Sequence, residues 1–151
     1  MSDIASAKPT VSFWAISVVL LLWGLGGASI YVAYFVETPQ EFAATAETAA
    51  NSEAYAEYVG QIPAWAIGVG IVAAAARLFG AIALLLRSGW AVPLYVTSLV
   101  FFAGALYRAF MVVNVAAVMN PAHIAVEILF LALSIFAVWF ALRNRADGIL
   151  R

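Results

Sequence analysis

Cysteine is absent from the sequence, histidine occurs once, and charged residues make up only 10% of the 151 positions. Without cysteine the chain has no disulfide, thiol redox centre, zinc–cysteine site or covalently attached haem. A single histidine excludes a haem held by two histidines and leaves a metal coordination sphere mostly empty, so we predict no cofactor and no metal site. The net charge is −1, and lysine and arginine do not cluster, which excludes a nucleic-acid partner.

Hydrophobic residues make up 66% of the sequence and gather into four long runs. A soluble domain carries about 25% charged residues, so this composition excludes a water-soluble fold. Each run reaches the roughly 20 residues that an α-helix needs to cross a hydrocarbon core about 30 Å thick. The sequence therefore predicts an all-α membrane protein, a single domain of residues 1–151, with four transmembrane helices in an antiparallel bundle. The predicted helices span residues 13–36, 62–86, 91–113 and 124–142.

The distribution of lysine and arginine predicts the orientation of these helices. Residues 37–61, between the first two runs, contain five glutamates and no basic residue. Arg87 lies in the second loop, and three further arginines lie in the tail, residues 143–151. The positive-inside rule therefore places both termini in the cytoplasm and the acidic loop outside. The first run is longer than the 7–15 apolar residues of a signal peptide, so we expect it to be a retained helix.

The acidic loop carries the sequence signals of a short helical hairpin. Thr38 and Glu41 have the spacing of a capping box, with Pro39 at the first helical position. A second short helix is expected to end near Gly60. The apolar side chains that this loop would lay on the bundle or the membrane surface are Phe42, Tyr55, Tyr58 and Val59. In its simplest interpretation the loop is a solvated acidic lid that binds no ligand.

Small and polar residues recur at helical spacing along each run, as expected where helices pack closely in a membrane. The predicted seams are Ser17, Gly24, Ala28 and Tyr31; Ala66, Gly70, Ala73, Arg77 and Gly80; Thr97, Phe101, Gly104 and Arg108; and His123, Glu127, Leu131 and Ser134. We expect these seams to face one another inside the bundle. Most tryptophans lie near predicted helix ends, where indole rings favour the headgroup region, but Trp23 lies deep in the first run.

The candidate binding residues are Arg77, Arg108, Glu127 and His123, and no catalytic residue is predicted. Arg108 and Glu127 both fall in the outer half of the membrane, so we expect them to pair, at the least as a clamp between the third and fourth helices. His123 precedes Glu127 by four residues and shares its face, as an interfacial cap. Arg77 lies about nine residues, or roughly 13 Å, from the cytoplasmic end of its helix. No anion is expected beside it, although an arginine at the membrane centre costs about 2.5–3.5 kcal/mol.

The second and third runs also carry a resemblance. The segment IPAW at 62–65, the pair Arg77 and Gly80, and the segment LLLRSGWAVPLY at 84–95 resemble a group of short four-helix bacterial inner-membrane proteins. Members of that group are uncharacterised or described as sugar transporters, and their layout is distantly similar to that of DoxX-like proteins. The resemblance implies a location in the bacterial inner membrane but brings no established mechanism.

Three functions remain open on the sequence. The first is binding or transport of a small polar or anionic solute by a homo-oligomer, since four helices enclose an aqueous path poorly. The second is an accessory or structural subunit of a larger membrane complex. A carboxylate of the partner would then pair with the unmatched positive charge of Arg77. The third is an enzyme acting on lipid or quinone, for which His123 and Glu127 are the only candidate acid–base groups.

Overall fold

The computed structural model describes residues 8–45, 52–119 and 121–151, and in these ranges every regular element is a helix. Four of the described helices are long and apolar enough to cross a membrane. They are α1 (Val11–Val36), α4 (Ala64–Leu85), α5 (Ala91–Tyr107) continued by the π-helix η1 (Arg108–Val112), and α6 (Pro121–Ala146). The shorter elements are α2 (Pro39–Thr45), α3 (Ser52–Gly60) and the 3-10 helix η2 (Val115–Ala117). These elements fit the all-α membrane protein that the composition predicts.

The ends of the helices agree with the predicted spans within a few residues, except at the fourth. Helix α6 begins at Pro121 and continues to Ala146, so the tail predicted for residues 143–151 is shorter than expected. Proline is well tolerated in the first turn because its missing N–H would have no partner there. Arg143 and Arg145 lie in the last turn, where positive charge interacts favourably with the helix dipole. Both effects lengthen the helix beyond its apolar run.

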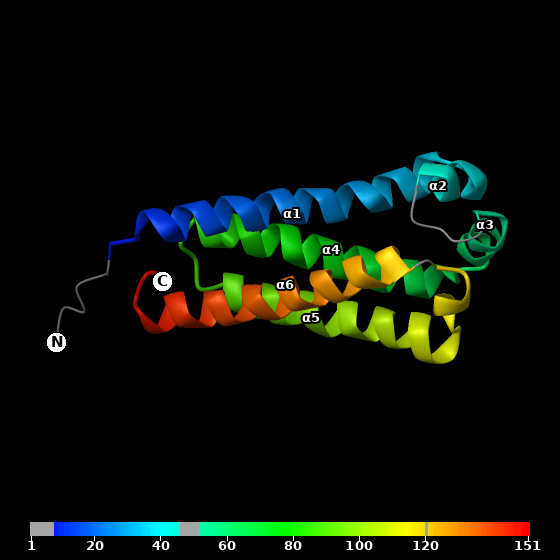
Figure 1. The fold of residues 1–151 in the computed structure, drawn as a ribbon. Helices are drawn as coiled ribbons and strands as arrows, with labels where there is room; N and C mark the ends of the chain where they lie inside the picture. Colours follow the sequence, from blue (N-terminus) through cyan, green and yellow to red (C-terminus); the bar gives the residue numbers. More distant parts are fainter. Residues whose placement is uncertain (1–7, 46–51, 120) are drawn as a thin grey trace.

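The long helices lie side by side, with the start of α1 and the end of α6 at one end and α2 and α3 at the other (Figure 1). Helix α4 packs against both α1 and α5, and α5 also packs against α6. Half of the α4 span is buried, a larger share than in any other long helix. Helix α4, which carries Arg77, is therefore the centre of the arrangement.

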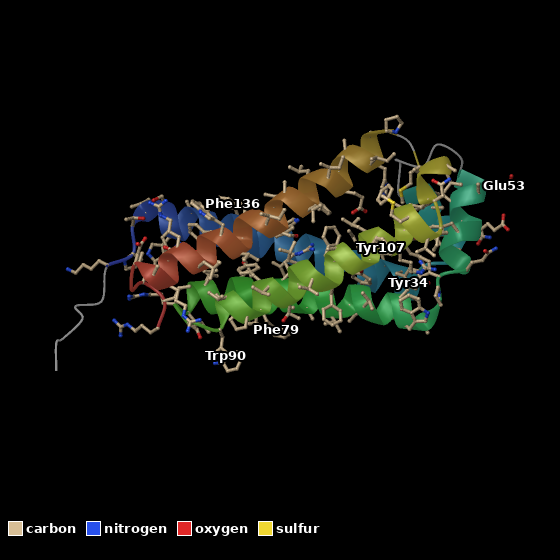
Figure 2. All side chains as sticks on the ribbon, turned by 90° about the horizontal axis from the view of Figure 1, so that it is seen from below. Tyr34, Glu53, Phe79, Trp90, Tyr107 and Phe136 are labelled. Atoms are coloured by element: carbon tan, nitrogen blue, oxygen red, sulfur yellow. The ribbon has the colours of Figure 1, made fainter. Side chains whose placement is uncertain are left out.

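The outer surface of the long helices is covered by large apolar side chains. Phe79, Trp90 and Phe136 are exposed and point away from the bundle (Figure 2). Trp65 and Trp139 are also exposed near helix ends. So large an apolar exterior suits a lipid environment, because soluble proteins rarely expose contiguous apolar surface of this extent.

Buried apolar side chains form two separate clusters. The first, which we call the terminal core, lies where α1 begins and α6 ends, and it includes Phe13, Leu84 and Phe140. Phe13 stacks on Phe140 with ring centroids 5.9 Å apart and so joins α1 to α6. The second, which we call the hairpin core, consists of Ala43, Tyr55, Ala56 and Val59. The terminal core also contains Tyr95, and Trp23 packs against it.

Glycines allow α4 to approach its neighbours closely. A Cβ at Gly24 of α1 would lie only 3.2 Å from the Cα of Leu78 on α4. A Cβ at Gly80 would lie 3.3 Å from the ring of Tyr95 on α5. The seams predicted for the first and second runs therefore do face neighbouring helices, as small residues do in membrane bundles.

The seam predicted for the third run is wrong. Phe101 is 36% exposed and Gly104 is also exposed, whereas Tyr95 and Ser98 are only 1% and 2% exposed. Helix α5 is therefore rotated about its axis, so that the residues it buries lie about one position away from the predicted ones. The physical reason is that the flat ring of Tyr95 packs on the bare backbone of Gly80. A rule based on small residues alone does not anticipate such a pair.

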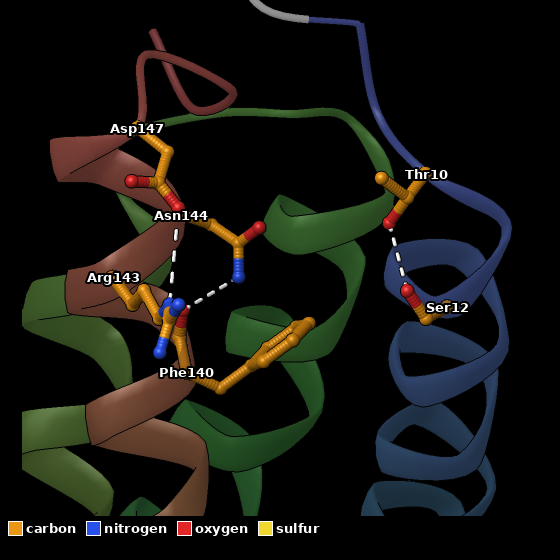
Figure 3. A network of polar contacts seen from close by, with 6 residues as sticks. All are labelled: Thr10, Ser12, Phe140, Arg143, Asn144 and Asp147. Carbon is orange, nitrogen blue, oxygen red and sulfur yellow. Dashed lines mark hydrogen bonds and ion pairs between the residues drawn. The ribbon is translucent and has the colours of Figure 1, made fainter.

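Local hydrogen bonds secure the two chain ends (Figure 3). Thr10 caps α1 by accepting a hydrogen bond from the N–H of Phe13 at 3.2 Å, and its hydroxyl is 2.8 Å from that of Ser12. The amide of Asn144 donates to the carbonyl of Phe140 at 2.7 Å. Arg143 lies 3.9 Å from Asp147 on the exposed side of α6.

The chain beyond α6 turns back onto the bundle. Gly148 has φ +71°, a left-handed conformation that favours glycine, and it reverses the chain after the helix. Ile149 and Leu150 are then buried in the terminal core. Arg87 donates from Nε to the carbonyl of Ile149 at 3.2 Å, and the N–H of Arg151 donates to the carbonyl of Arg87 at 2.9 Å. The tail is thus bound to the α4–α5 turn.

Replacing Gly24 with alanine is expected to destabilise the protein by about 1–3 kcal/mol, because the added methyl group meets the backbone of α4 and forces the helices apart. Gly26 is the matched control on the same helix, since a Cβ there meets nothing within 4 Å. Thermal unfolding followed by circular dichroism in detergent measures the difference. Equal stability of Gly24→Ala and Gly26→Ala would contradict the close approach.

Candidate binding site

The capping box predicted in the acidic loop is confirmed. The N–H and the hydroxyl of Thr38 both donate to Oε2 of Glu41 at 2.8 Å, and the N–H of Glu41 lies 3.3 Å from the Thr38 hydroxyl. These hydrogen bonds lower the pKa of Glu41, and the bond from the backbone N–H of Thr38 has the largest effect. Residues 46–51 of the predicted loop, including Glu47, lie outside the described residues.

Helices α2 and α3 contact each other, and we call this pair of helices the α2–α3 hairpin. Its apolar side packs on the end of the bundle, as predicted: Tyr34 of α1, together with Val118 and Met119, contacts the hairpin core. The Tyr34 hydroxyl reaches the carbonyl of Val59 at 3.5 Å. The hairpin therefore covers one end of the four long helices.

A cavity of about 570 Å³ lies beneath the hairpin. Helices α1, α3, α4, α5, η1 and α6 all contribute to its walls, which are mostly apolar and aromatic, with Trp65 and Phe102 among them. The polar side chains that line it are Tyr31, Tyr34, Tyr55, Tyr58, Tyr107, Arg108, His123 and Glu127. Three of the four predicted binding residues therefore share one cavity, and α6 contributes only His123 and Glu127 to it.

Arg108 occupies the start of the π-helix. The N–H of Val113 donates to the Arg108 carbonyl at 3.0 Å, a bond that spans five residues and widens the turn. The guanidinium lies 5.6 Å from the centre of the Trp65 ring and interacts with the neighbouring Tyr58 side chain. Nothing in the local sequence indicates a π-helix, and the aromatic partners come from α3 and α4.

The ion pair expected between Arg108 and Glu127 does not form: no nitrogen of Arg108 lies within 4.0 Å of that carboxylate. Glu127 instead lies 3.5 Å from Nε2 of His123, one turn earlier on α6, so these two share a face as predicted. His123 also packs against the Tyr55 ring at a centroid distance of 6.0 Å. The pairing expectation failed because the hairpin brings Tyr58 to Arg108.

Arg77 does not line the cavity and is only 4% exposed. Its guanidinium carbon lies 4.1 Å from the centre of the Trp23 ring and 5.1 Å from that of Phe102. Cation–π contacts reach about 2 kcal/mol each when desolvated, so two of them offset much of the 2.5–3.5 kcal/mol that a central arginine costs. The one sequence signal for this contact was the position of Trp23, away from the helix ends.

Two side chains close the cavity above Arg77. Tyr31 and Phe102 both line the cavity, and Phe102 also contacts the Arg77 guanidinium. A Cβ at Gly70 would overlap the Tyr31 hydroxyl, so the tyrosine rests directly on the backbone of α4. The predicted site is thus divided into an outer cavity with Arg108 and a deeper position occupied by Arg77.

Burial also perturbs the tyrosines of the hairpin. Removal from solvent raises the pKa of Tyr55 to about 12, and the nearby Tyr58 and Glu127 contribute to this rise. Burial raises the pKa of Tyr58 as well, and the neighbouring Arg108 opposes the rise. Both hydroxyls are therefore neutral hydrogen-bonding groups around neutral pH.

Comparison with known proteins supplies no relative: no family model, no curated protein and no solved structure matches this chain. The resemblance of its second and third runs to short four-helix inner-membrane proteins stays a prediction. The chemistry of the outer cavity and of Arg77 therefore carries the functional argument alone.

Replacing Tyr55 with phenylalanine is expected to change how stability depends on pH. Because the folded-state pKa of Tyr55 lies above the ordinary value of 10, its stabilising effect is complete below pH 10 and is lost as the pH rises through about 12. The wild type should therefore lose more stability than Tyr55→Phe between about pH 9 and 11.5. Denaturant unfolding at both pH values tests this, and equal losses would show that Tyr55 is not buried.

Proposed function

We propose that this protein binds a small solute with an anionic group and an apolar or aromatic body, and that an oligomer of it moves the solute across a bacterial inner membrane. The outer cavity is the binding site. In this proposal the four long helices cross the bilayer as an antiparallel bundle, the acidic hairpin is external and both termini are cytoplasmic. The distribution of arginine and lysine supports that orientation.

The observation that carries the proposal is the cavity itself. Its volume of about 570 Å³ lies within the range of small-molecule sites, which are concave, mostly apolar and equipped with a few polar groups. Arg108 only donates hydrogen bonds, and the groups that contact it, Tyr58 and Trp65, carry no negative charge. An anionic group on the solute would supply that charge and form strong charge-assisted hydrogen bonds.

His123 and Glu127 would set the orientation of the solute. Their side chains lie on the same face of α6 and line the cavity together with apolar and aromatic side chains of α4 and α5. The Glu127 carboxylate accepts hydrogen bonds and repels a second anionic group, so it favours a solute with a single negative charge and a separate hydrogen-bond donor. The apolar walls then favour a hydrocarbon or aromatic body over a sugar.

An accessory-subunit role finds less support. That hypothesis requires a partner's carboxylate to reach Arg77, yet this side chain is 4% exposed and enclosed by Trp23 and Phe102. A partner would have to separate α1 from α4 to reach it. Purification in mild detergent distinguishes the two functions, since a companion protein in constant stoichiometry would favour the accessory subunit.

Binding of radiolabelled benzoate to the protein in lipid nanodiscs tests the proposal, because benzoate combines one carboxylate with an aromatic body. We expect saturable binding that excess benzyl alcohol and glucose do not displace. Arg108→Gln should weaken it about tenfold, the effect of losing a hydrogen bond to a charged group. Arg143→Gln is the matched control, because Arg143 lies at the other end of the bundle and outside the cavity.

Two results would contradict the proposal. Benzoate that binds equally well to the wild type and to Arg108→Gln would show that this arginine does not recognise the anion. Displacement of the bound benzoate by excess glucose would assign the cavity to polyols. Uptake of benzoate into proteoliposomes, compared between the same variants, then separates transport from binding alone.

A further inference from the structure

Several polar groups inside the bundle lack a hydrogen-bond partner among the described residues. In the layer around Arg77 they are Nε1 of Trp23, Nε of Arg77, the hydroxyl of Tyr95 and the hydroxyl of Ser98. Arg77, Tyr95 and Ser98 are 4%, 1% and 2% exposed. Buried polar groups are nearly always paired, so such a concentration of unpaired ones calls for a physical explanation.

Other buried serines show that Ser98 is unusual. The hydroxyl of Ser17 donates to the carbonyl of Phe13 at 2.8 Å, and that of Ser134 donates to the carbonyl of Phe130 at 2.8 Å. Both use the carbonyl four residues earlier in their own helix, the ordinary partner of a serine inside a helix. Ser98 forms no such bond, although it is buried in the same way.

The other unpaired groups converge on Arg77 from two neighbouring helices, α1 and α5. Trp23 of α1 covers one side of the guanidinium, and the Tyr95 ring of α5 packs on Gly80, one turn below Arg77 on α4. Ser98 follows Tyr95 by three residues and precedes Phe102, which contacts Arg77, by four. Residues at these spacings share one helix face, so Ser98 is directed at the same layer.

The unpaired polar groups in this layer are all able to donate hydrogen bonds. The indole and guanidinium N–H groups only donate, and the two hydroxyls can also donate. Among the residues described, no carboxylate oxygen lies within 4.0 Å of an Arg77 nitrogen. Gly27 lets the guanidinium lie directly against α1, where a Cβ would be only 3.1 Å from Nη1.

We propose that Trp23, Arg77, Tyr95 and Ser98 form a deep binding site for a small monovalent anion such as a halide or formate. Such an anion accepts hydrogen bonds from several donors at once and neutralises Arg77 in a medium of low dielectric constant. Water would accept the same bonds but would leave the charge uncompensated. The site is separate from the outer cavity, whose walls include none of these residues, and it does not depend on solute binding there.

Trp23 itself reports on this site, because bromide quenches indole fluorescence. The full chain is prepared in nanodiscs with Trp14, Trp65, Trp90 and Trp139 replaced by phenylalanine, and bromide is exchanged for gluconate at constant ionic strength. We expect quenching of Trp23 that saturates and that formate, which does not quench, reverses. A matched protein that retains only Trp65 reports on the outer cavity and so distinguishes an anion at Arg108 from one at Arg77.

Conservative variants identify the donors. Ser98→Ala and Tyr95→Phe each remove one hydroxyl and should raise the dissociation constant of bromide about threefold to tenfold, the effect of one hydrogen bond. Ser17→Ala and Ser134→Ala, whose hydroxyls bond within their own helices, should leave it unchanged. Arg77→Gln should abolish saturable quenching. Quenching of Trp23 that never saturates, or a dissociation constant equal in Ser98→Ala, Tyr95→Phe and the serine controls, would overturn the proposal.

Discussion

The bundle is organised around a charge that is held between aromatic rings. Arg77 lies on the most buried helix, and its guanidinium is enclosed by Trp23 of α1 and Phe102 of α5. Those rings reach it because glycines let the helices approach, above all Gly24 on α1. Aromatic rings cover the charge, because their faces attract a guanidinium and aliphatic side chains do not.

The two ends of the molecule differ in how tightly they are packed. At one end, the stacking of Phe13 on Phe140 and the returning tail close the terminal core. At the other end, the hairpin packs over the long helices and leaves the outer cavity beneath it. In this cavity Arg108 interacts with Tyr58 and Trp65, and Glu127 pairs with His123. A cation and an anion that do not pair with each other therefore both line this cavity.

Features governed by neighbours in the chain were predictable. The capping box of Thr38 and Glu41 depends on three-residue spacing, and the shared face of His123 and Glu127 depends on four. Features governed by helix rotation were not. The small-residue pattern of the third run selects Phe101 and Gly104, yet α5 turns a different face inward. The π-helix likewise has no local signature, because it reflects how the end of α5 fits its surroundings.

The sequence by itself determined the class of protein, the approximate spans of its long helices and the identity of the residues that carry charge inside them. These follow from composition and periodicity, since the bilayer sets the length of a spanning helix and penalises every charge within it. Only the tertiary structure decided which partners those charges meet. The contacts of Arg77 with Trp23 and of Arg108 with Tyr58 join segments far apart in the chain, and their formation depends on helix rotation and close packing, which no local pattern encodes.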